Sequence, residues 1–348
     1  MMASSRAGHA THLAIRPADL RVDRDVLIRT LSQYLTLDSN ARRFDWLYQE
    51  NPAGPAKVWI AEGAHGPTGV GAAFPRRLMV QGVEISACVL GDFCIAPEHR
   101  SLGPAVQLQR ACLEPIHSGW AAAAYDFPSE GMMAVYRRLR IAQSTQLIRL
   151  AKPLRADRTV ARHVRSKAAA RGLSAVANWA LRMRDLSARD DASTSVELHA
   201  GPCGDEFTEL ARRVSAAYGV CLFRSAEYLN WRFHANPLAP CEILTARREG
   251  KLVGFAVTAL HEENGSMLDL FGEIDERMVG SLVQRITDRM RGRGVMTLSV
   301  PMTPAHPFFP ILSGLGFHPR ESCPVVVATD RKELAGAHWS LMAGDRDL

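Results

Sequence analysis

The residues best suited to chemistry in this chain form the loop Arg100-Ser101-Leu102-Gly103-Pro104-Ala105. An apolar segment, 89–96, precedes this loop, and a helical pattern follows it. A loop between a strand and a helix presents several backbone N–H groups and the positive end of the helix dipole at one point. The glycine and alanine let a ligand approach the backbone closely, and proline is tolerated as a first helical residue. The loop is therefore a candidate phosphate or pyrophosphate site, with an ordinary helix start as the alternative.

The spacing Arg-x-x-Gly-x-Ala resembles the acyl-CoA pyrophosphate loop, Arg/Gln-x-x-Gly-x-Gly/Ala, of the GCN5-related N-acetyltransferase (GNAT) superfamily. The resemblance implies that the loop holds acetyl-CoA or another acyl-CoA as co-substrate, and that no metal is needed. It also implies that backbone groups of Cys94, Ile95 and Ala96 pair with the pantetheine arm, as an added strand pairs with a sheet edge. A salt bridge within the turn is the alternative role for Arg100.

Two further residues are candidates for proton transfer. The segment Tyr136-Arg-Arg-Leu-Arg140-Ile141 resembles the Tyr-x-x-x-Gly-Phe segment of the GNAT proteins, although Arg140-Ile141 replaces Gly-Phe. The resemblance implies that Tyr136 protonates the leaving thiolate; its alternative is core packing with the hydroxyl at the edge. Asp92 lies in the apolar strand where the family often has a carboxylate. It would accept the proton of the amine through water, or else pair structurally with an arginine.

The chain contains an internal repeat. Trp46-x4-Asn-Pro and Trp231-x4-Asn-Pro are 185 residues apart, and the segments that follow them match at the same offset. A repeat of this length predicts two copies of one unit. We expect a GNAT domain with the acyl-CoA loop at 1–152, a basic linker at 153–195 and a GNAT-like domain at 196–348. The corresponding segment of the second copy, 272–280, lacks the Arg/Gln-x-x-Gly-x-Gly/Ala spacing and has acids where a pyrophosphate would lie, so we expect this copy to be degenerate.

Hydrophobic periodicity predicts the order βααβββαβαβ in the first half. The expected strands are 12–15, 57–61, 70–80, 83–96, 120–127 and 145–151, and the expected helices are 24–35, 40–50, 105–116 and 130–139. This order matches that of the GNAT fold. The fold class expected is therefore α/β with a mixed sheet, as two GNAT-like domains, each a central mixed sheet flanked by helices.

Composition excludes few functional classes. The 348 residues are 47% hydrophobic and 22% charged, as in an ordinary globular protein, and the net charge of +6 favours anionic partners. No apolar run reaches the length of a membrane span. Seven cysteines are scattered without zinc-site spacing, which indicates reduced thiols in a cytoplasmic protein.

The basic region between the halves contains a predicted helix, 168–183, with an apolar side. One interpretation is a helix that contacts an anionic membrane or polyanion. The other is an interdomain helix whose arginines are simply solvated.

The function expected from the resemblance is acyl-CoA-dependent N-acylation of a small amine or amino sugar, by direct attack of the amine on the thioester in a ternary complex. One alternative is an aminoacyl-tRNA-dependent transferase that resembles the Fem family, since the basic region could hold tRNA phosphates. Another is a non-catalytic binding or scaffold protein. The favoured interpretation involves no specific nucleic acid, and the sequence leaves the acceptor, the acyl chain length and the oligomeric state open.

Overall fold

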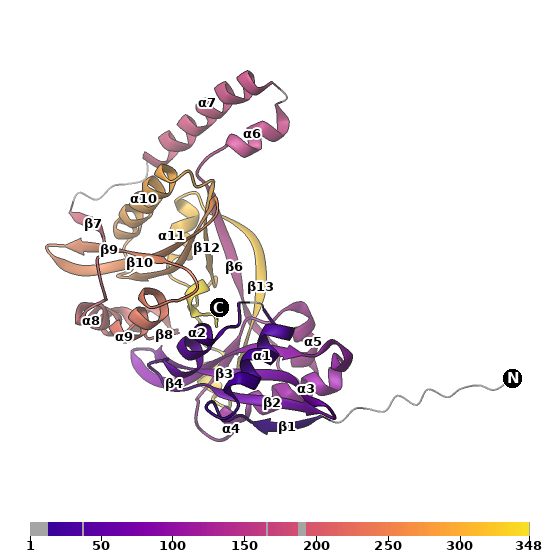
Figure 1. Ribbon diagram of the computed structural model, residues 1–348. Coiled ribbons are helices and arrows are strands. Elements are labelled where there is room, and N and C mark those ends of the chain that lie inside the picture. Colours follow the sequence, from indigo (N-terminus) through magenta and orange to yellow (C-terminus); the bar gives the residue numbers. More distant parts are fainter. Residues whose placement is uncertain (1–12, 37, 165, 187–192, 348) are drawn as a thin grey trace.

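A mixed sheet of thirteen strands runs through the whole molecule, flanked by helices (Figure 1). The computed structural model describes residues 13–36, 38–164, 166–186 and 193–347. Along the sheet the strand order is β1-β2-β3-β4-β5-β13-β6-β12-β11-β10-β9-β7, and the short strand β8 pairs with β3.

The elements of the first half follow the predicted order. Its strands are β1 (Ala14–Pro17), β2 (Lys57–Gly63), β3 (Gly66–Val80), β4 (Val83–Ile95), β5 (Ala124–Asp126) and β6 (Gln143–Pro153). Its helices are α1 (Arg24–Tyr34), α2 (Ala41–Phe44), η1 (Asp45–Gln49), η2 (Pro97–His99), α3 (Leu102–Cys112), α4 (Glu114–His117) and α5 (Glu130–Arg138). The expected strand 120–127 is reduced to β5, which pairs with β4 over two residues and with β13 over three.

A helical pair follows the first half, and the elements of the second half come after it. The pair is α6 (Asp157–His163) and α7 (Lys167–Leu186). The later strands are β7 (Thr194–Leu198), β8 (Val220–Leu222), β9 (Cys241–Arg248), β10 (Lys251–His261), β11 (Asn264–Gly272), β12 (Thr297–Met302) and β13 (His318–Ala328). The later helices are α8 (Asp205–Val214), η3 (Ser215–Tyr218), α9 (Ala226–Leu229), η4 (Asn230–His234), α10 (Glu276–Gly292), α11 (Phe308–Gly314), α12 (Lys332–Ala335) and η5 (Ala343–Asp345).

The two halves exchange their last strands. We expected the strand 145–151 to close the sheet of the first half, but β6 pairs with β12 of the second half, and β13 of the second half pairs with β5. The strands β6 and β13 also pair with each other, antiparallel, and so join the two parts into one sheet. The exchange leaves neither half with an unpaired edge at the centre, where an open edge would invite aggregation.

The two repeated tryptophans meet where the halves touch. Trp46 and Trp231 stack with ring centroids 5.3 Å apart. Each indole N–H donates to the backbone carbonyl of the other residue over 2.8 Å. Both tryptophans lie in short π-helices, η1 and η4, so the expected helix 40–50 is α2 continued by η1. One buried apolar cluster contains side chains of both halves.

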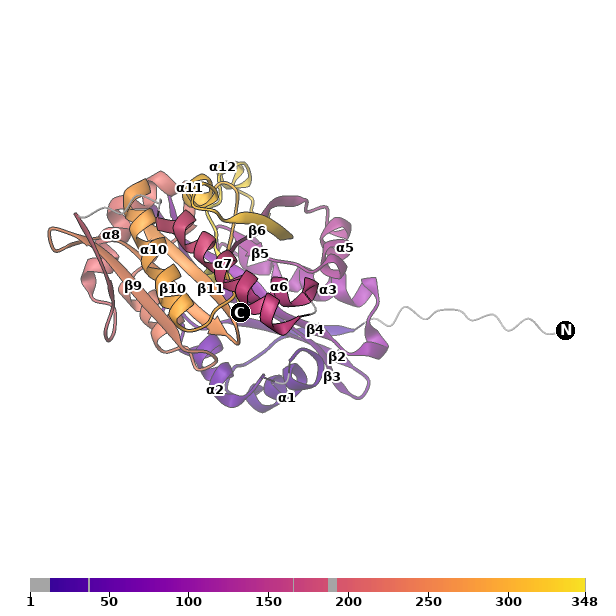
Figure 2. The ribbon, with the colours of Figure 1, turned by 90° about the horizontal axis from the view of Figure 1, so that it is seen from above.

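The helices α6 and α7 form a hairpin that projects from the body of the molecule (Figure 1). Seen from above, the two helices lie side by side (Figure 2). The helix predicted at 168–183 is α7, which extends a few residues further at its C-terminal end. Among the residues that the structure describes, no helix combines the length and apolar character needed to cross a membrane.

Candidate active site

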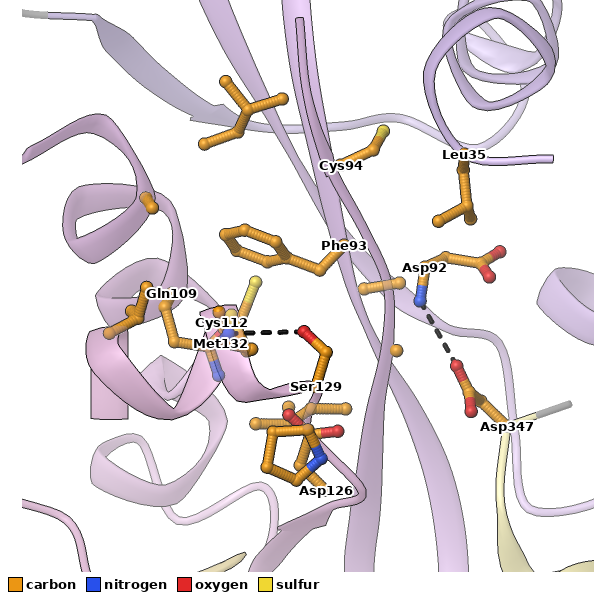
Figure 3. A pocket seen from close by; sticks show the side chains of 18 of the residues that line it. Leu35, Asp92, Phe93, Cys94, Gln109, Cys112, Asp126, Ser129, Met132 and Asp347 are labelled. Atoms are coloured by element: carbon orange, nitrogen blue, oxygen red, sulfur yellow. Dashed lines mark hydrogen bonds between the residues drawn. The ribbon is translucent and has the colours of Figure 1, made fainter. Parts of the chain in front are cut away.

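A cavity of about 770 Å³ lies where β4 and β5 separate. The two strands pair in parallel only at Cys88–Ala124 and Val89–Tyr125, and beyond these positions residues of both strands line the cavity. Residues of α3, the first turns of α5, the end of α1 and the C-terminal residues Arg346 and Asp347 also line it (Figure 3). The split between parallel strands therefore places backbone, helix N-terminus and side-chain carboxylates around one space.

A β-bulge shapes the wall that β4 contributes. Gly91 pairs with Ala72 and Cys94 with Val70, so Asp92 and Phe93 lie opposite a single residue of β3. Asp92 has φ of 46°, in the left-handed region that Asp tolerates better than most residues. A bulge bends its strand and removes residues from the ladder. Here it turns β4 at the point where the cavity begins.

The carboxylate of Asp92 holds this bulge in place. It is buried and accepts hydrogen bonds from two nitrogens of the Arg43 guanidinium over 2.6 and 2.8 Å. The hydroxyl of Tyr48 donates to the same carboxylate over 2.5 Å. Three donors from α2 and η1 therefore surround Asp92. This is the structural pairing with an arginine that the sequence analysis gave as the alternative to proton transfer.

The loop at the start of α3 borders the cavity with Arg100, Ser101, Leu102 and Ala105. Ser101 is the N-cap residue, but its side chain makes no capping hydrogen bond. Because the first N–H groups of a helix lack partners within the helix, those at the start of α3 are available to an anion. A Cβ built on Gly103 would meet no atom within 4 Å, so the space over the loop is open.

At the end of β4, successive residues direct their backbone groups alternately toward β3 and toward the cavity. The N–H of Ala96 donates to the carbonyl of Thr68 in β3 over 2.7 Å, which fixes that residue to the sheet. Because strand residues alternate, the backbone of Ile95 faces the cavity side. There the Nε of Arg100 donates to the Ile95 carbonyl over 2.8 Å. Arg100 therefore bonds to the backbone, and no ion pair involving it is found among the described residues.

Tyr136 lies behind the cavity wall. Its side chain is fully buried, and it is not among the cavity-lining residues. Its hydroxyl donates to Asp126 over 2.6 Å and accepts from the Gln109 amide over 2.8 Å. Burial, followed by the charge of Asp126, raises the pKa of Tyr136 well above its usual value. Asp126 and Gln109, which both line the cavity, thus lie between this hydroxyl and the cavity.

Asp126 is the titratable group that this arrangement presents to the cavity. It is the last residue of β5, and its side chain lines the cavity. Burial raises the pKa of Asp126 to about 7, and the hydrogen bond from Tyr136 opposes that rise. Near neutral pH this carboxyl group is present in both protonation states, as a general acid or base requires.

The C-terminal segment brings a second carboxylate to the cavity. Asp347 accepts a hydrogen bond from the N–H of Asp92 over 3.3 Å, and Figure 3 shows it reaching toward the bulge. Arg232 fixes the segment by donating to the carbonyl oxygens of Gly344, Arg346 and Asp347. A Cβ at Gly91 would lie 2.0 Å from the Asp347 carboxylate, so a larger residue there would displace the Asp347 side chain.

Sequence reasoning missed several residues of this site, and some of them carried a signal. Asp126 ends an otherwise apolar strand, which is where parallel strands present polar groups to a ligand. Gln109 lies in α3, but nothing in its spacing distinguishes it. Asp347 is 255 residues from the bulge that it contacts, so no local pattern connects the two.

Comparison with known proteins identifies the fold. No family model and no curated protein matches the sequence. A GCN5-related N-acetyltransferase from Anabaena variabilis ATCC 29413 superposes with a TM-score of 0.67 at 14% identity, over 91% of this chain and 73% of that one. The chain has the GNAT fold.

Two further matches to the GNAT fold span both halves. A probable N-acyltransferase from Enterococcus faecalis V583 has a TM-score of 0.66 at 11% identity, over 92% of this chain and 72% of that one. Saccharomyces cerevisiae N-myristoyltransferase with bound myristoyl-CoA has a TM-score of 0.59 at 12% identity, over 94% of this chain and 81% of that one.

The helix that follows β11, α10, begins differently from α3. Asp275 caps α10 and accepts hydrogen bonds from the N–H groups of Arg277 and Met278. Its carboxylate also pairs with Arg248 over 2.7 Å. A helix N-terminus that already holds a carboxylate repels a second anion.

Among the described residues no cluster of His, Cys, Asp and Glu is arranged to hold a metal ion.

Proposed function

We propose that the protein is an acyl-CoA-dependent N-acyltransferase whose active site is the cavity between β4 and β5. The observation that carries the proposal is the coincidence of two features. The Arg-x-x-Gly-x-Ala loop starts a helix without a side-chain cap, and that helix N-terminus borders the cavity of about 770 Å³. The GNAT fold of the chain, and the myristoyl-CoA bound in one of the matched structures, support the same assignment.

The acyl-CoA would lie along the end of β4. The N–H groups at the start of α3 and the guanidinium of Arg100 would bind the pyrophosphate, and the open space over Gly103 gives it room. Pantetheine would pair with the backbone on the cavity side, at Ile95 rather than at Cys94 or Ala96. The bulge at Asp92 and Phe93 would direct the thioester carbonyl carbon into the cavity.

Asp126 is the catalytic residue in this proposal. The amine nitrogen attacks the thioester carbonyl carbon, the C–N bond forms, and the C–S bond breaks with its electron pair leaving on sulfur. The ionised Asp126 carboxylate accepts the proton that the amine loses, and the protonated form returns it to the thiolate. Tyr136 is a positioning residue, because its hydroxyl contacts Asp126 and its side chain does not line the cavity. Gln109 lines the cavity, and its amide donates to the Tyr136 hydroxyl.

The acceptor would enter from the side of Asp347. The Asp347 carboxylate beside the bulge attracts a cationic amine. The amine loses one proton to solvent before the attack, so that the neutral nitrogen carries the lone pair that forms the C–N bond. A small amine or an amino sugar carries the positive charge that suits the Asp347 carboxylate. The acyl donor would be acetyl-CoA or a longer acyl-CoA. The second half would contribute the wall of the acceptor site through its C-terminal segment, and it would bind no CoA of its own.

The test is a screen of amines and amino sugars by CoA release from acetyl-CoA and from a longer acyl-CoA. The proposal predicts turnover with at least one acceptor, and a loss of about 100-fold or more in kcat for Asp126→Asn. Its matched control is Asp330→Asn, which changes an exposed carboxylate outside the cavity and leaves turnover unchanged. Turnover that is unaffected by Asp126→Asn would contradict the role of Asp126.

A further inference from the structure

The helix α7 carries an apolar stripe that nothing in the described chain covers. Four large side chains form it, and each is about half exposed or more: Leu173 (53%), Val176 (65%), Trp179 (62%) and Met183 (47%). They recur every three or four residues, so they share one side of the helix. An uninterrupted apolar stripe of this kind marks an interaction surface more often than a scatter of single apolar residues does.

The opposite side of α7 is fixed to the rest of the molecule. The buried Asp185 pairs with Lys152 over 3.0 Å and also with Arg291. Asn178 accepts a hydrogen bond from the N–H of Ala156 and donates one to Asp157. These contacts hold the helix in one orientation, and the hairpin projects from the body of the molecule (Figure 1).

The exposed charge of the hairpin is positive. Residues 157–186 contain seven lysines and arginines but only two acids, Asp157 and Asp185. Both acids are engaged, Asp157 with Arg155 and Asp185 as described above. Arg171 and Arg182 are exposed and eleven residues apart, so they lie on the same flank of α7, next to Trp179. The apolar stripe is therefore bordered by two arginines whose charge the acids of the hairpin do not neutralise.

We propose that α7 lies flat on an anionic lipid bilayer, with its apolar stripe at the boundary of headgroups and acyl chains. A helix of this type combines apolar side chains, among them a tryptophan, with Lys and Arg on its polar face. The arginines would contact lipid phosphates. A second copy of the chain is a poorer occupant, since it would bring the same cationic flanks together. A polyanion without acyl chains would leave the stripe in water.

The test is co-sedimentation of the full chain with vesicles of phosphatidylcholine alone and with about one third phosphatidylglycerol. We expect binding to the anionic vesicles that weakens as salt is raised. Trp179→Ser, Leu173→Ser and the double variant Arg171→Gln/Arg182→Gln should each lower the partition coefficient about tenfold. Ile274→Ser is the matched control, because Ile274 is 49% exposed outside the hairpin, and it should bind as the wild type does.

Three results would overturn the proposal. In the first, the wild type does not bind anionic vesicles. In the second, Trp179→Ser binds them as strongly as the wild type does. In the third, the wild type forms a dimer that Trp179→Ser dissociates, and neither protein binds vesicles. Circular dichroism checks that each variant is folded. CoA release in solution is measured alongside, and because the hairpin residues do not line the cavity, its failure would concern the proposed function and not this surface.

Discussion

At the scale of single residues, the proposed chemistry depends on the environment of Asp126. Burial raises the pKa of this carboxyl group to about 7, so its ionised, proton-accepting form becomes dominant as pH rises through that value. We therefore predict that kcat/KM rises with pH through about 7. Asp126→Asn should remove this limb of the profile as well as most of the rate. If the limb persists in the variant, the group that titrates near this pH is not Asp126.

The partner of Asp126 gives a second prediction. The hydroxyl of Tyr136 donates to Asp126 and favours its ionised form. Tyr136→Phe should therefore move the limb to higher pH while kcat at the alkaline plateau is largely kept. A pH–rate profile of the variant measures this. If kcat instead fell at every pH, Tyr136 would itself protonate the thiolate, as its resemblance to the family's tyrosine implies.

At the scale of elements, the bulge of β4 depends on a buried ion pair. Asp92→Asn leaves the Arg43 guanidinium buried without its carboxylate, and we predict a loss of about 3–5 kcal/mol in the free energy of unfolding. Asparagine tolerates the positive φ at this position, so backbone strain does not confuse the result. The double variant Arg43→Met/Asp92→Asn should recover part of the loss. Urea denaturation measures all three proteins.

A different outcome would restore the catalytic hypothesis for Asp92. If Asp92→Asn kept its stability but lost turnover, its carboxylate would act on the substrate rather than on the bulge. The free energy of unfolding of the variant is therefore as informative as its rate.

The elements of the first half were largely predictable, and the reasons are local. Helix α1, for example, was expected at 24–35 and spans Arg24–Tyr34, because its apolar periodicity and its first-turn acid act over short distances. The role of Asp92 could only be left open, because the Arg43 that pairs with it lies 49 residues earlier in the sequence. The place of Tyr136 behind Asp126 likewise depends on how α5 packs on α3, which helical periodicity alone does not specify.

At the scale of the whole molecule, the exchanged strands and the tryptophan pair make the halves interdependent. We predict one cooperative unfolding transition for the chain, seen at the same denaturant concentration by far-UV and near-UV circular dichroism. Trp46→Phe removes one of the two reciprocal hydrogen bonds and should lower the free energy of unfolding by about 1–3 kcal/mol without separating the transition into two. Two resolved transitions would show that the halves fold separately.

The sequence repeat identified the tryptophans but not the strand exchange. The spacing of Trp46 and Trp231 was visible because both copies keep the same local motif. The pairing of β6 with β12 and of β13 with β5 joins strands that are far apart in the chain, and their alternation of side chains fits either partner. Register across such distances is set by the packing of both halves together.

The central claim is that the loop at the start of α3 binds acyl-CoA and that the second half does not. Calorimetric titration of acetyl-CoA into the protein tests it most directly, with Gly103→Glu and a matched control, Gly204→Glu. Both glycines lie at helix N-termini, and a Cβ at either position would have no atom within 4 Å, so both variants should fold. We predict one CoA per chain, with binding abolished by Gly103→Glu and unchanged by Gly204→Glu. No binding to the wild type, or equal binding to Gly103→Glu, would contradict the claim.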